Sequence, residues 1–411
     1  MWPRLLNDTQ RRHEVEPPIV GRQPAAFLLF YGLAYTGGVI GYLPLLTFLL
    51  PIKVEAIAGD ARLGVFTACV IAGAVAASLS NVLFGWLSDR SLARGGGRRR
   101  WVVGGLVATA LSYAGFAAAS SSATIVLAVM AFQAAINMAL APLIAIMADE
   151  VPDAQKGTVG GLLALGYPVA GAVAAGLLSV DFRSEALPLG IVMLAVAACI
   201  APLLLTRARR IEEPPDTPLR RQMLGHDLAV AWGARILVQI AGAVLSLYLL
   251  YYFESLSHAP QPRLAAHVSH VLTIAYLVPV PIAIAIGRLS DRLGRRKPFL
   301  VGIAMLAVLG LVGMTMARSP GAGAAAFAAY ATGSAVFLAL HAAFAMQLLP
   351  SSRHRGRDLG LLNLTNTLPS LVGPLLTWLL ATPGDFDTAL LALAGLTLCG
   401  GLLVLGVRGR R

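Results

Sequence analysis

Long apolar runs recur along the whole chain. The 411-residue sequence is 57% hydrophobic and only 13% charged, whereas a soluble domain carries about 25% charged residues. The charges are clustered, which leaves apolar windows of about 18 residues or more, enough to cross a hydrocarbon core about 30 Å thick. These windows are continuous rather than alternating, and backbone polar groups cannot stay unpaired in lipid, so they predict helices. We therefore expect an all-α integral membrane protein.

The apolar pattern predicts twelve transmembrane helices in two sets of six. The predicted spans are 26–50, 62–87, 101–119, 122–148, 157–180 and 186–206, then 227–253, 266–288, 299–317, 322–349, 357–381 and 388–407. A polar, proline-rich segment at 207–226 separates the two sets, as a linker separates domains. The predicted organisation is a tail at 1–25, a six-helix bundle at 26–206, the linker, a second six-helix bundle at 227–407 and a tail at 408–411.

Arginine and lysine are concentrated in alternate connections. The segments 90–100, 207–226 and 292–297 are rich in arginine, whereas the connections on the other side hold only five basic residues, Lys53, Arg62, Arg183, Arg263 and Arg318. Basic residues stay on the cytoplasmic side of a membrane, so both tails and the linker are expected to be cytoplasmic, in the cytoplasmic (inner) membrane. The same bias explains the net charge of +12 by contact with the lipid bilayer, without nucleic acid as a partner. The polar first 24 residues predict no cleavable signal peptide.

A six-residue motif occurs twice, about half the chain apart. Gly85-Trp-Leu-Ser-Asp-Arg90 and Gly287-Arg-Leu-Ser-Asp-Arg292 share the frame GxLSDR, and each copy follows an apolar run and precedes a basic cluster. A repeat of this period between hydrophobic spans is typical of transporters built from two homologous bundles. The two six-helix bundles are therefore predicted to be pseudosymmetric.

The second copy continues to Lys297 as GRLSDRLGRRK and resembles the loop motif G-x-L-x-D-R-x-G-R-R/K of the major facilitator superfamily. The first copy contains the extra residues 91–96 and ends in GRRRW, a form similar to the glycoside–pentoside–hexuronide/cation symporters and sucrose-transporter-like proteins. The segments 148–157 and 349–360, each a proline followed by a basic residue and glycine, fit the same branch. The resemblance covers nearly the whole chain and implies the twelve-helix fold of that superfamily and secondary transport.

Charged residues in these motifs predict a latch between the bundles. A carboxylate at the end of one helix can meet the positive N-terminus of another helix, and the adjacent arginine can reach a second carboxylate. The resemblance implies that Asp89 meets the start of helix 357–381, while Arg90 meets Asp149 or Glu150 at the end of helix 122–148.

The second motif copy predicts a weaker counterpart of this latch. By pseudosymmetry Asp291 meets the start of helix 157–180, whereas Arg292 finds no carboxylate at the end of helix 322–349, where Gln347 stands. The expected latch is therefore asymmetric, with more contacts on the first side. The alternative is that both loops only set topology and stability.

Polar side chains within apolar helices indicate the helices that face the solute. Several helices carry such side chains on one face, at helical spacing. The predicted pathway residues are Tyr31, Tyr35, Gln133, Asn137, Arg235, Gln239, Tyr330, His341, Asn363 and Asn366. The helices 186–206, 299–317 and 388–407 have almost no polar residue at their centres, so they are expected to face lipid.

Several of these residues have two interpretations. Arg235 lies about two turns inside its helix, where an unpaired charge costs at least ~2.5 kcal/mol. It either binds a substrate anion or carboxylate, or snorkels or bonds to helix ends. His341 either carries a proton or packs as a neutral side chain. Gln133 and Asn137 either line the pathway or bond between helices, and the tyrosines of helix 26–50 either bind a sugar or aromatic solute or form a packing face.

Catalytic and energy-coupling motifs of other protein classes do not occur in the sequence. It contains no phosphate-binding loop, no cluster with metal-ligand spacing and no nucleophile–base frame, so we expect no enzyme activity, ATP, metal or cofactor. No acidic residue precedes Asp89 in helix 62–87, which argues against sodium coupling by the route that the resemblance implies.

The sequence as a whole favours a monomeric secondary transporter for a small organic solute. The solute is expected to be glycoside-like or a related polar compound, taken up by symport with protons that His341 or the Asp149 and Glu150 pair could carry. One alternative is proton-coupled efflux of amphipathic compounds, since the helix centres are apolar. Another is a protein of the same fold that does not transport and acts as a sensor or assembly partner.

Overall fold

The computed structural model describes residues 22–178, 186–208, 218–256, 268, 271–275, 277–349, 354–380 and 386–408, and these residues form helices without any strand. The first half holds α1 (Ala25–Pro44), a π-helical turn (Leu45–Leu49), α2 (Leu50–Ala58), a 3-10 turn (Gly59–Ala61), α3 (Arg62–Ala93), α4 (Arg98–Ala118), α5 (Ser122–Glu150), α6 (Asp153–Leu163), α7 (Gly166–Leu178) and α8 (Ala186–Leu204). The second half holds α9 (Pro218–Leu256), α11 (Pro279–Leu293), α12 (Lys297–Met316), α13 (Pro320–Gln347), α14 (Arg355–Leu380), α15 (Asp387–Leu403) and a 3-10 turn (Val404–Gly406).

The predicted helical membrane fold is confirmed. Eleven segments within the described residues are long and apolar enough to cross a membrane, and α14 occupies the place of the predicted span 357–381. The first tail up to residue 21, residues 209–217 of the linker and residues 409–411 lie outside the described residues, as do several residues between 257 and 270 in and before the predicted span 266–288.

The first helix is longer than predicted. It continues from α1 through the π-helical turn and α2 to Ala61, so the helical run of 37 residues passes well beyond the predicted end at residue 50. Within the turn, the Leu50 N–H donates to the carbonyl of Leu45, five residues before it. Pro51 has no N–H to donate to Thr47 four residues before it, which explains why the helix widens at this point.

The predicted helix 157–180 is two helices. α6 ends at Leu163 and α7 begins at Gly166, with two tight-turn hydrogen bonds, Ala164 N–H to Gly161 and Leu165 N–H to Leu162, across the break. Pro168 explains the break, because it cannot donate to the carbonyl of Ala164 and its ring crowds that carbonyl. The chain is thus interrupted near the middle of this membrane span.

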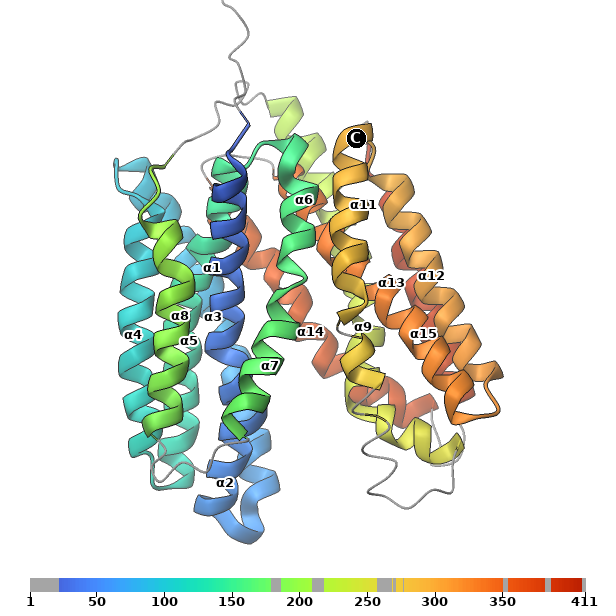
Figure 1. The fold of residues 1–411 in the computed structure, drawn as a ribbon, viewed down its shortest axis with the longest axis horizontal. Coiled ribbons are helices and arrows are strands. Elements are labelled where there is room, and N and C mark those ends of the chain that lie inside the picture. Colours follow the sequence, from blue (N-terminus) through green and yellow to red (C-terminus); the bar gives the residue numbers. More distant parts are fainter. Residues whose placement is uncertain are drawn as a thin grey trace, which may run out of the picture.

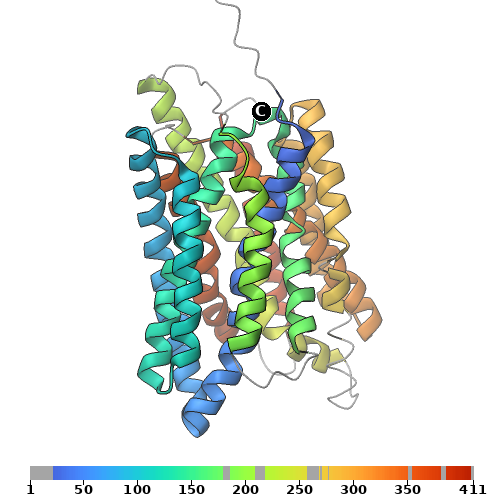
Figure 2. The ribbon, with the colours of Figure 1, turned by 60° about the vertical axis from the view of Figure 1, so that its left-hand side comes forward.

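Buried apolar residues form clusters, one of which extends from the first half to Ala343 of α13 and Leu359 of α14. That cluster lies mainly in the first half, around Phe132 and Ile136 of α5, and two others lie in the second half, around Phe253 of α9 and Phe337 of α13. Figures 1 and 2 show the helices of each half side by side and roughly parallel. As expected for helices that face lipid, α8, α12 and α15 expose large apolar side chains; these include Leu194, Leu309 and Leu391.

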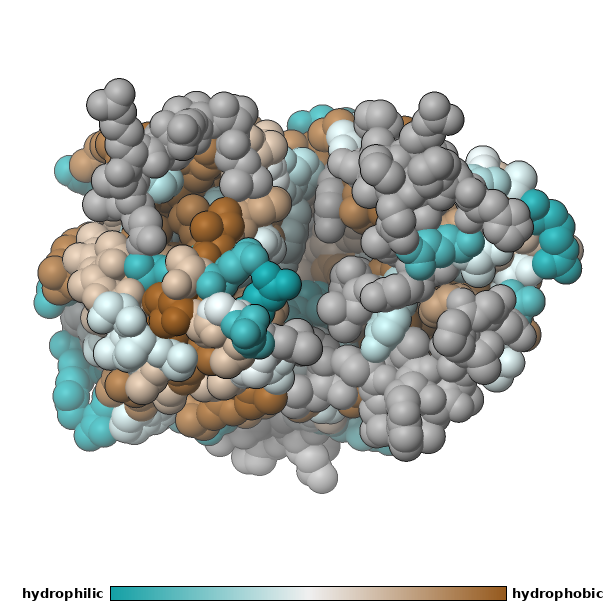
Figure 3. All heavy atoms as spheres, turned by 90° about the horizontal axis from the view of Figure 1, so that it is seen from below, coloured by the Kyte–Doolittle hydropathy of each residue, from teal (hydrophilic) through white to brown (hydrophobic). Residues whose placement is uncertain are grey.

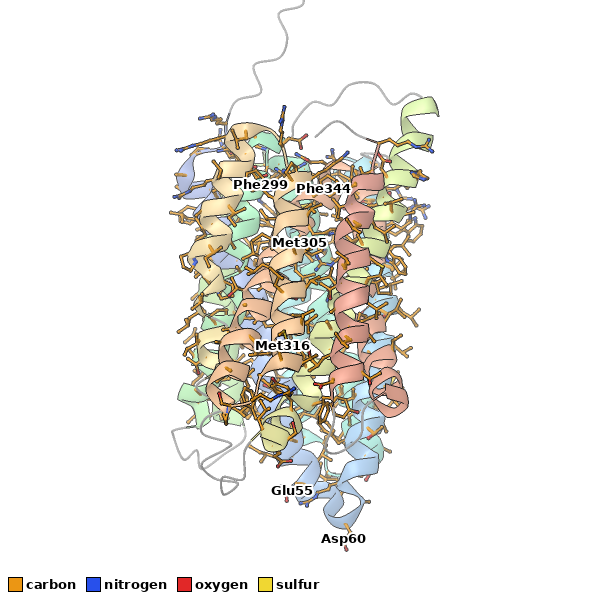
Figure 4. All side chains as sticks on the ribbon, turned by 90° about the vertical axis from the view of Figure 1, so that its right-hand side faces the viewer. Glu55, Asp60, Phe299, Met305, Met316 and Phe344 are labelled. Atoms are coloured by element: carbon orange, nitrogen blue, oxygen red, sulfur yellow. The ribbon has the colours of Figure 1, made fainter. Side chains whose placement is uncertain are left out.

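The two ends of the molecule differ. We call the end at which α3, α5 and α11 finish the terminal face, because the C-terminus lies there (Figure 1). Figure 4 shows that α12 runs away from this face, with Phe299 near it and Met316 near the opposite face. Figure 3, which looks onto the opposite face, shows a hollow between the two halves.

Candidate functional site

Asp89 at the end of α3 joins the two halves at the terminal face. Its two carboxylate oxygens accept hydrogen bonds from the backbone N–H groups of Gly356 at 2.9 Å and Arg357 at 3.0 Å. Both donors lie in the first turn of α14, where unpaired N–H groups and the helix dipole attract a negative charge. The contact expected of Asp89 is therefore present, with its side chain buried.

Arg98, the first residue of α4, lies at the centre of this first latch. Its guanidinium donates to Asp89 at 2.8 Å and to the Ser88 hydroxyl at 2.7 Å, and it also forms an ion pair with Asp149. Asp149 accepts a further bond at 2.9 Å from Arg355, which precedes Gly356 in the second half. A buried carboxylate is thus shared by arginines of both halves, which compensates for its desolvation.

The role predicted for Arg90 is wrong. Arg90 is exposed and lies over the ring of Trp86, 5.4 Å from its centroid, while Arg98 pairs with Asp149 and Arg99 forms a bidentate pair with Glu150 at 2.6 and 2.9 Å. The extra residues 91–96 explain the exchange. They lengthen α3 to Ala93 and then form a turn in which Gly95 adopts a φ of 79°, and this turn brings the start of α4 back against α3. The basic block after the insertion therefore supplies the pairing arginines.

Asp291 at the end of α11 forms the second latch. It accepts from the backbone N–H groups of Gly157 at 3.0 Å and Thr158 at 2.7 Å, and from the Thr158 hydroxyl at 3.0 Å. Arg296 donates to Asp291 at 2.9 Å and to the backbone carbonyl of Asp153 at 2.8 Å. Arg292 is exposed. The structure therefore contains the expected contact of Asp291. The two latches differ, but through the pair of Asp149 with Arg355 rather than through Arg90 and Arg292.

Glycine pairs allow the helix backbones to touch at both latches. A Cβ atom on Gly85 would lie 2.2 Å from the carbonyl oxygen of Gly356, and one on Gly356 would lie 2.3 Å from that of Gly85. The second pair behaves in the same way, since a Cβ on Gly287 would lie 2.3 Å from the carbonyl oxygen of Gly157. Each glycine that opens a GxLSDR motif therefore packs against the glycine that follows a basic residue in the other half.

A second group of polar residues lies between the halves, away from the terminal face. Arg235 of α9 donates to the Thr365 hydroxyl at 3.0 Å, to the Leu338 carbonyl at 3.2 Å and, at 3.4 Å, to Asn366. Asn366 also accepts from Gln239 at 3.0 Å and donates to Asn363. Arg235 and Gln239 are half-buried and Asn366 is exposed. We call Arg235, Gln239, Asn363 and Asn366 the polar row.

Tyrosines of the first half approach the polar row. The Tyr42 hydroxyl is hydrogen-bonded to that of Tyr167 at 3.1 Å, and Tyr35 and Tyr167 lie close enough to Arg235 to interact with its charge. Tyr167 follows the break between α6 and α7, and Tyr35 packs beside that break at Gly166. Sequence reasoning missed Tyr167 and Thr365, although Pro168 beside Tyr167 marks the interrupted helix.

Four predicted pathway residues are buried rather than open to the hollow. Tyr31 is 0% exposed and donates to the Leu143 carbonyl at 3.2 Å. Asn137 is 5% exposed and accepts from Asn81 at 2.7 Å, so it bonds between helices. Tyr330 packs beside Phe327, and His341 is enclosed by two phenylalanines of its own helix, Phe337 and Phe344.

Gln133 has an intermediate position. Its side chain is half-buried beside Gly73 of α3, and its backbone carbonyl accepts from Asn137 at 2.8 Å. Of the ten predicted pathway residues, the structure thus brings Tyr35, Arg235, Gln239, Asn363 and Asn366 together between the halves. The other five lie within the packing of single halves.

Comparison with known proteins identifies the family. The sequence profile of the Major Facilitator Superfamily matches residues 25–261 and again residues 231–411. The chain belongs to this superfamily. Its members are transporters rather than enzymes. No curated protein sequence matches the chain significantly.

Solved structures of this superfamily share the fold. The human organic anion transporter MFSD10 is 16% identical, with a TM-score of 0.70 over 93% of this chain and 100% of its own. The proton:xylose symporter XylE is 13% identical, with a TM-score of 0.70 over 93% of this chain and 95% of its own. The transporter FucP in its outward conformation is also 13% identical, with a TM-score of 0.69 over 94% and 99%. At these identities the likeness shows the fold alone.

Proposed function

We propose that this chain is a secondary active transporter that moves a small organic solute by alternating access. The observation that carries the proposal is the difference between the two faces. Hydrogen bonds and glycine pairs hold the halves together at the terminal face, while the hollow between them opens on the opposite face (Figure 3). Because the contacts at the latches are polar and repeated, they can break and re-form as the halves rock.

The arginine bias supports a location in the cytoplasmic membrane with the terminal face toward the cytoplasm. In that orientation the hollow opens outward, as in the structure described for FucP. We propose that the chain works as a monomer, since one chain supplies both halves and the whole polar row. The solute is a polar organic compound such as a glycoside, within reach of the polar row and the tyrosines.

We propose protons as the coupling ion. The helix centres contain no carboxylate, so the groups available to carry a proton are His341 and the latch carboxylates Asp149 and Glu150. His341 is enclosed by aromatic rings, whereas opening of the terminal face separates Asp149 from Arg355 and admits water to it. Solute uptake into proteoliposomes, measured with and without an inward pH gradient, tests this part, and uptake that ignores the gradient would contradict it.

The latches provide the test of alternating access. Spin labels at the exposed residues Arg94 and Arg295 report the distance across the terminal face, and labels at Ser120 and Arg318 report the opposite face, in a variant without the native cysteines. Asp89→Asn should lengthen the first distance and shorten the second, because bonds to a charged acceptor contribute about 1.5–3 kcal/mol each. The matched control is Glu55→Gln, which removes an exposed carboxylate at the opposite face.

The outcome separates the proposal from its alternatives. In Asp89→Asn we expect one label distance to lengthen and the other to shorten. We expect the same opposite changes in the protein that keeps Asp89 when a transported solute is added. Distances that stay fixed in Asp89→Asn and with every solute would contradict alternating access and would favour a sensor or assembly role. Saturable export instead of uptake in oriented proteoliposomes would favour efflux.

A further inference from the structure

We propose that the solute is an organic carboxylate whose anionic group binds Arg235 in the hollow between the halves. The inference rests on the proposed transport function and specifies the chemical class of its solute. It depends on three features of Arg235: the uncompensated charge, the access from the hollow and the tyrosines opposite.

Among the residues that the structure describes, no carboxylate pairs with the positive charge of Arg235. All three of its hydrogen-bond acceptors, the Thr365 hydroxyl, the Leu338 carbonyl and the Asn366 amide, are neutral. Neutral acceptors satisfy some of the five N–H groups of a guanidinium but leave its charge in place. α13 contains no acidic residue, and α9 contains none between Asp227 and Glu254. An unpaired charge at this depth is expensive and marks a functional position.

Neighbouring helices cannot supply the missing anion either. α14 contains no acidic residue after Asp358, and Asp358 is bonded to Arg357 at 2.8 Å near the terminal face. In the first half, α1 and α7 contain no acidic residue, and Asp89 and Asp149 are held in the first latch. Among the residues that the structure describes, no acidic side chain therefore neutralises the charge of Arg235, and an anionic solute could do so.

Arg235 is accessible to a solute. Its side chain is half-buried and its neighbour Asn366 is exposed, so the polar row borders open space rather than the packed interior. A guanidinium offers two parallel N–H groups that match a carboxylate, and its single charge favours a monoanion.

The tyrosines opposite can hold the body of the solute. Tyr35 and Tyr167 belong to the first half and lie within range of the Arg235 charge, and Tyr167 is 47% exposed. Their hydroxyls can donate to an anion, and their ring faces can stack on an aromatic ring or a sugar ring. A carboxylate between Arg235 and these tyrosines would therefore connect the two halves.

Matched pairs of compounds test the charge requirement. Binding of benzoate against benzamide, and of glucuronate against glucose, is measured by thermal shift and titration on the full chain in nanodiscs at constant ionic strength. We expect at least one carboxylate to bind while its neutral counterpart does not. Arg235→Gln should weaken that binding by about tenfold or more, as expected when a charged hydrogen-bonded pair is lost. Arg318→Gln, which removes an exposed arginine at the face where the hollow opens, should leave it unchanged.

A second variant distinguishes loss of the binding site from misfolding of the protein. Arg235→Lys keeps the charge but loses the planar pair of donors, so it should bind the same carboxylate more weakly and still reject the neutral compound. Equal binding of both members of each pair, failure of both carboxylates to bind, or an Arg235→Gln affinity within about twofold of the original overturns the inference.

The inference and the transport function fail in different ways. Saturable uptake of a neutral solute, with Arg235→Gln fully active, would overturn the carboxylate site and leave transport intact. Carboxylate binding that depends on Arg235, but without flux and without any change in the two label distances, would keep the site and overturn transport.

Discussion

The two latches share one contact and differ in what surrounds it. Asp89 and Asp291 each accept backbone N–H groups from the first turn of a helix in the other half. At the first latch, Asp149 adds an ion pair between the halves through Arg355. At the second latch, Arg296 of the second half donates to the neutral backbone carbonyl of Asp153 in the first half.

The difference shows how a duplicated motif diverged. The shared contact needs only Asp and glycine in fixed places, and both motif copies have kept them. The ion pair between the halves also needs an acid at the end of the preceding helix, and the second half has Gln347 and Leu348 where the first has Asp149 and Glu150. We therefore expect the terminal face to open first on the side of Asp291, with the first latch as the later step.

The largest expected effect is at the glycine pairs. Gly85→Ala and Gly287→Ala each place a Cβ within 2.2–2.3 Å of a carbonyl oxygen of the other half, so the terminal face cannot close in either variant. Alanine favours a helix by about 1 kcal/mol over glycine, so any loss of the closed terminal face must come from the clash and not from a weaker helix. The distance between labels at 94 and 295 should lengthen in both. Gly64→Ala, on α3 with open space around it, is the control, and a closed face in Gly85→Ala would refute the pairing.

The arginines of the two latches should differ in their effect on stability. Arg98 pairs with two buried carboxylates, Asp89 and Asp149, and Arg98→Gln removes both pairs. Loss of one member of a buried ion pair costs about 3–5 kcal/mol of stability, so we expect a loss of that size. Arg296→Gln removes the ion pair with Asp291 and the bond to the Asp153 carbonyl. Asp291 keeps three other hydrogen bonds, so the cost should be about 1.5–3 kcal/mol. Thermal unfolding in nanodiscs measures both. Equal losses would mean that the asymmetry of the contacts has no energetic consequence.

The sequence predicted the contacts that depend on spacing along the chain. The twelve spans follow from apolar length, and Asp89 and Asp291 follow from a repeated motif whose position fixes their place at the helix ends. The partner of Asp149 could not be predicted in this way. Arg90 belongs to the motif itself, whereas Arg98 follows the inserted residues and reaches Asp149 only because the chain turns between α3 and α4.

Depth along a helix was the second feature that the sequence could not supply. Tyr31 and Tyr35 lie on one face of α1, but Tyr31 is nearer to the closed terminal face and is fully buried, whereas Tyr35 borders the open part. Helical periodicity identifies a polar face but not the point at which the neighbouring half begins to cover it.

The smallest effect should distinguish two adjacent carboxylates. Asp149 and Glu150 both pair with arginines of their own half, but only Asp149 also binds Arg355 of the other half. Asp149→Asn should therefore destabilise the closed terminal face by about 1.5 kcal/mol, the lower end for a charged hydrogen bond, and should lengthen the distance between labels at 94 and 295 in part of the population. Glu150→Gln, the matched control, should leave that distance unchanged because its pair with Arg99 lies within one half. If both variants opened the face equally, the ion pair between the halves would have no part in holding it closed, and the two latches would differ in composition but not in strength.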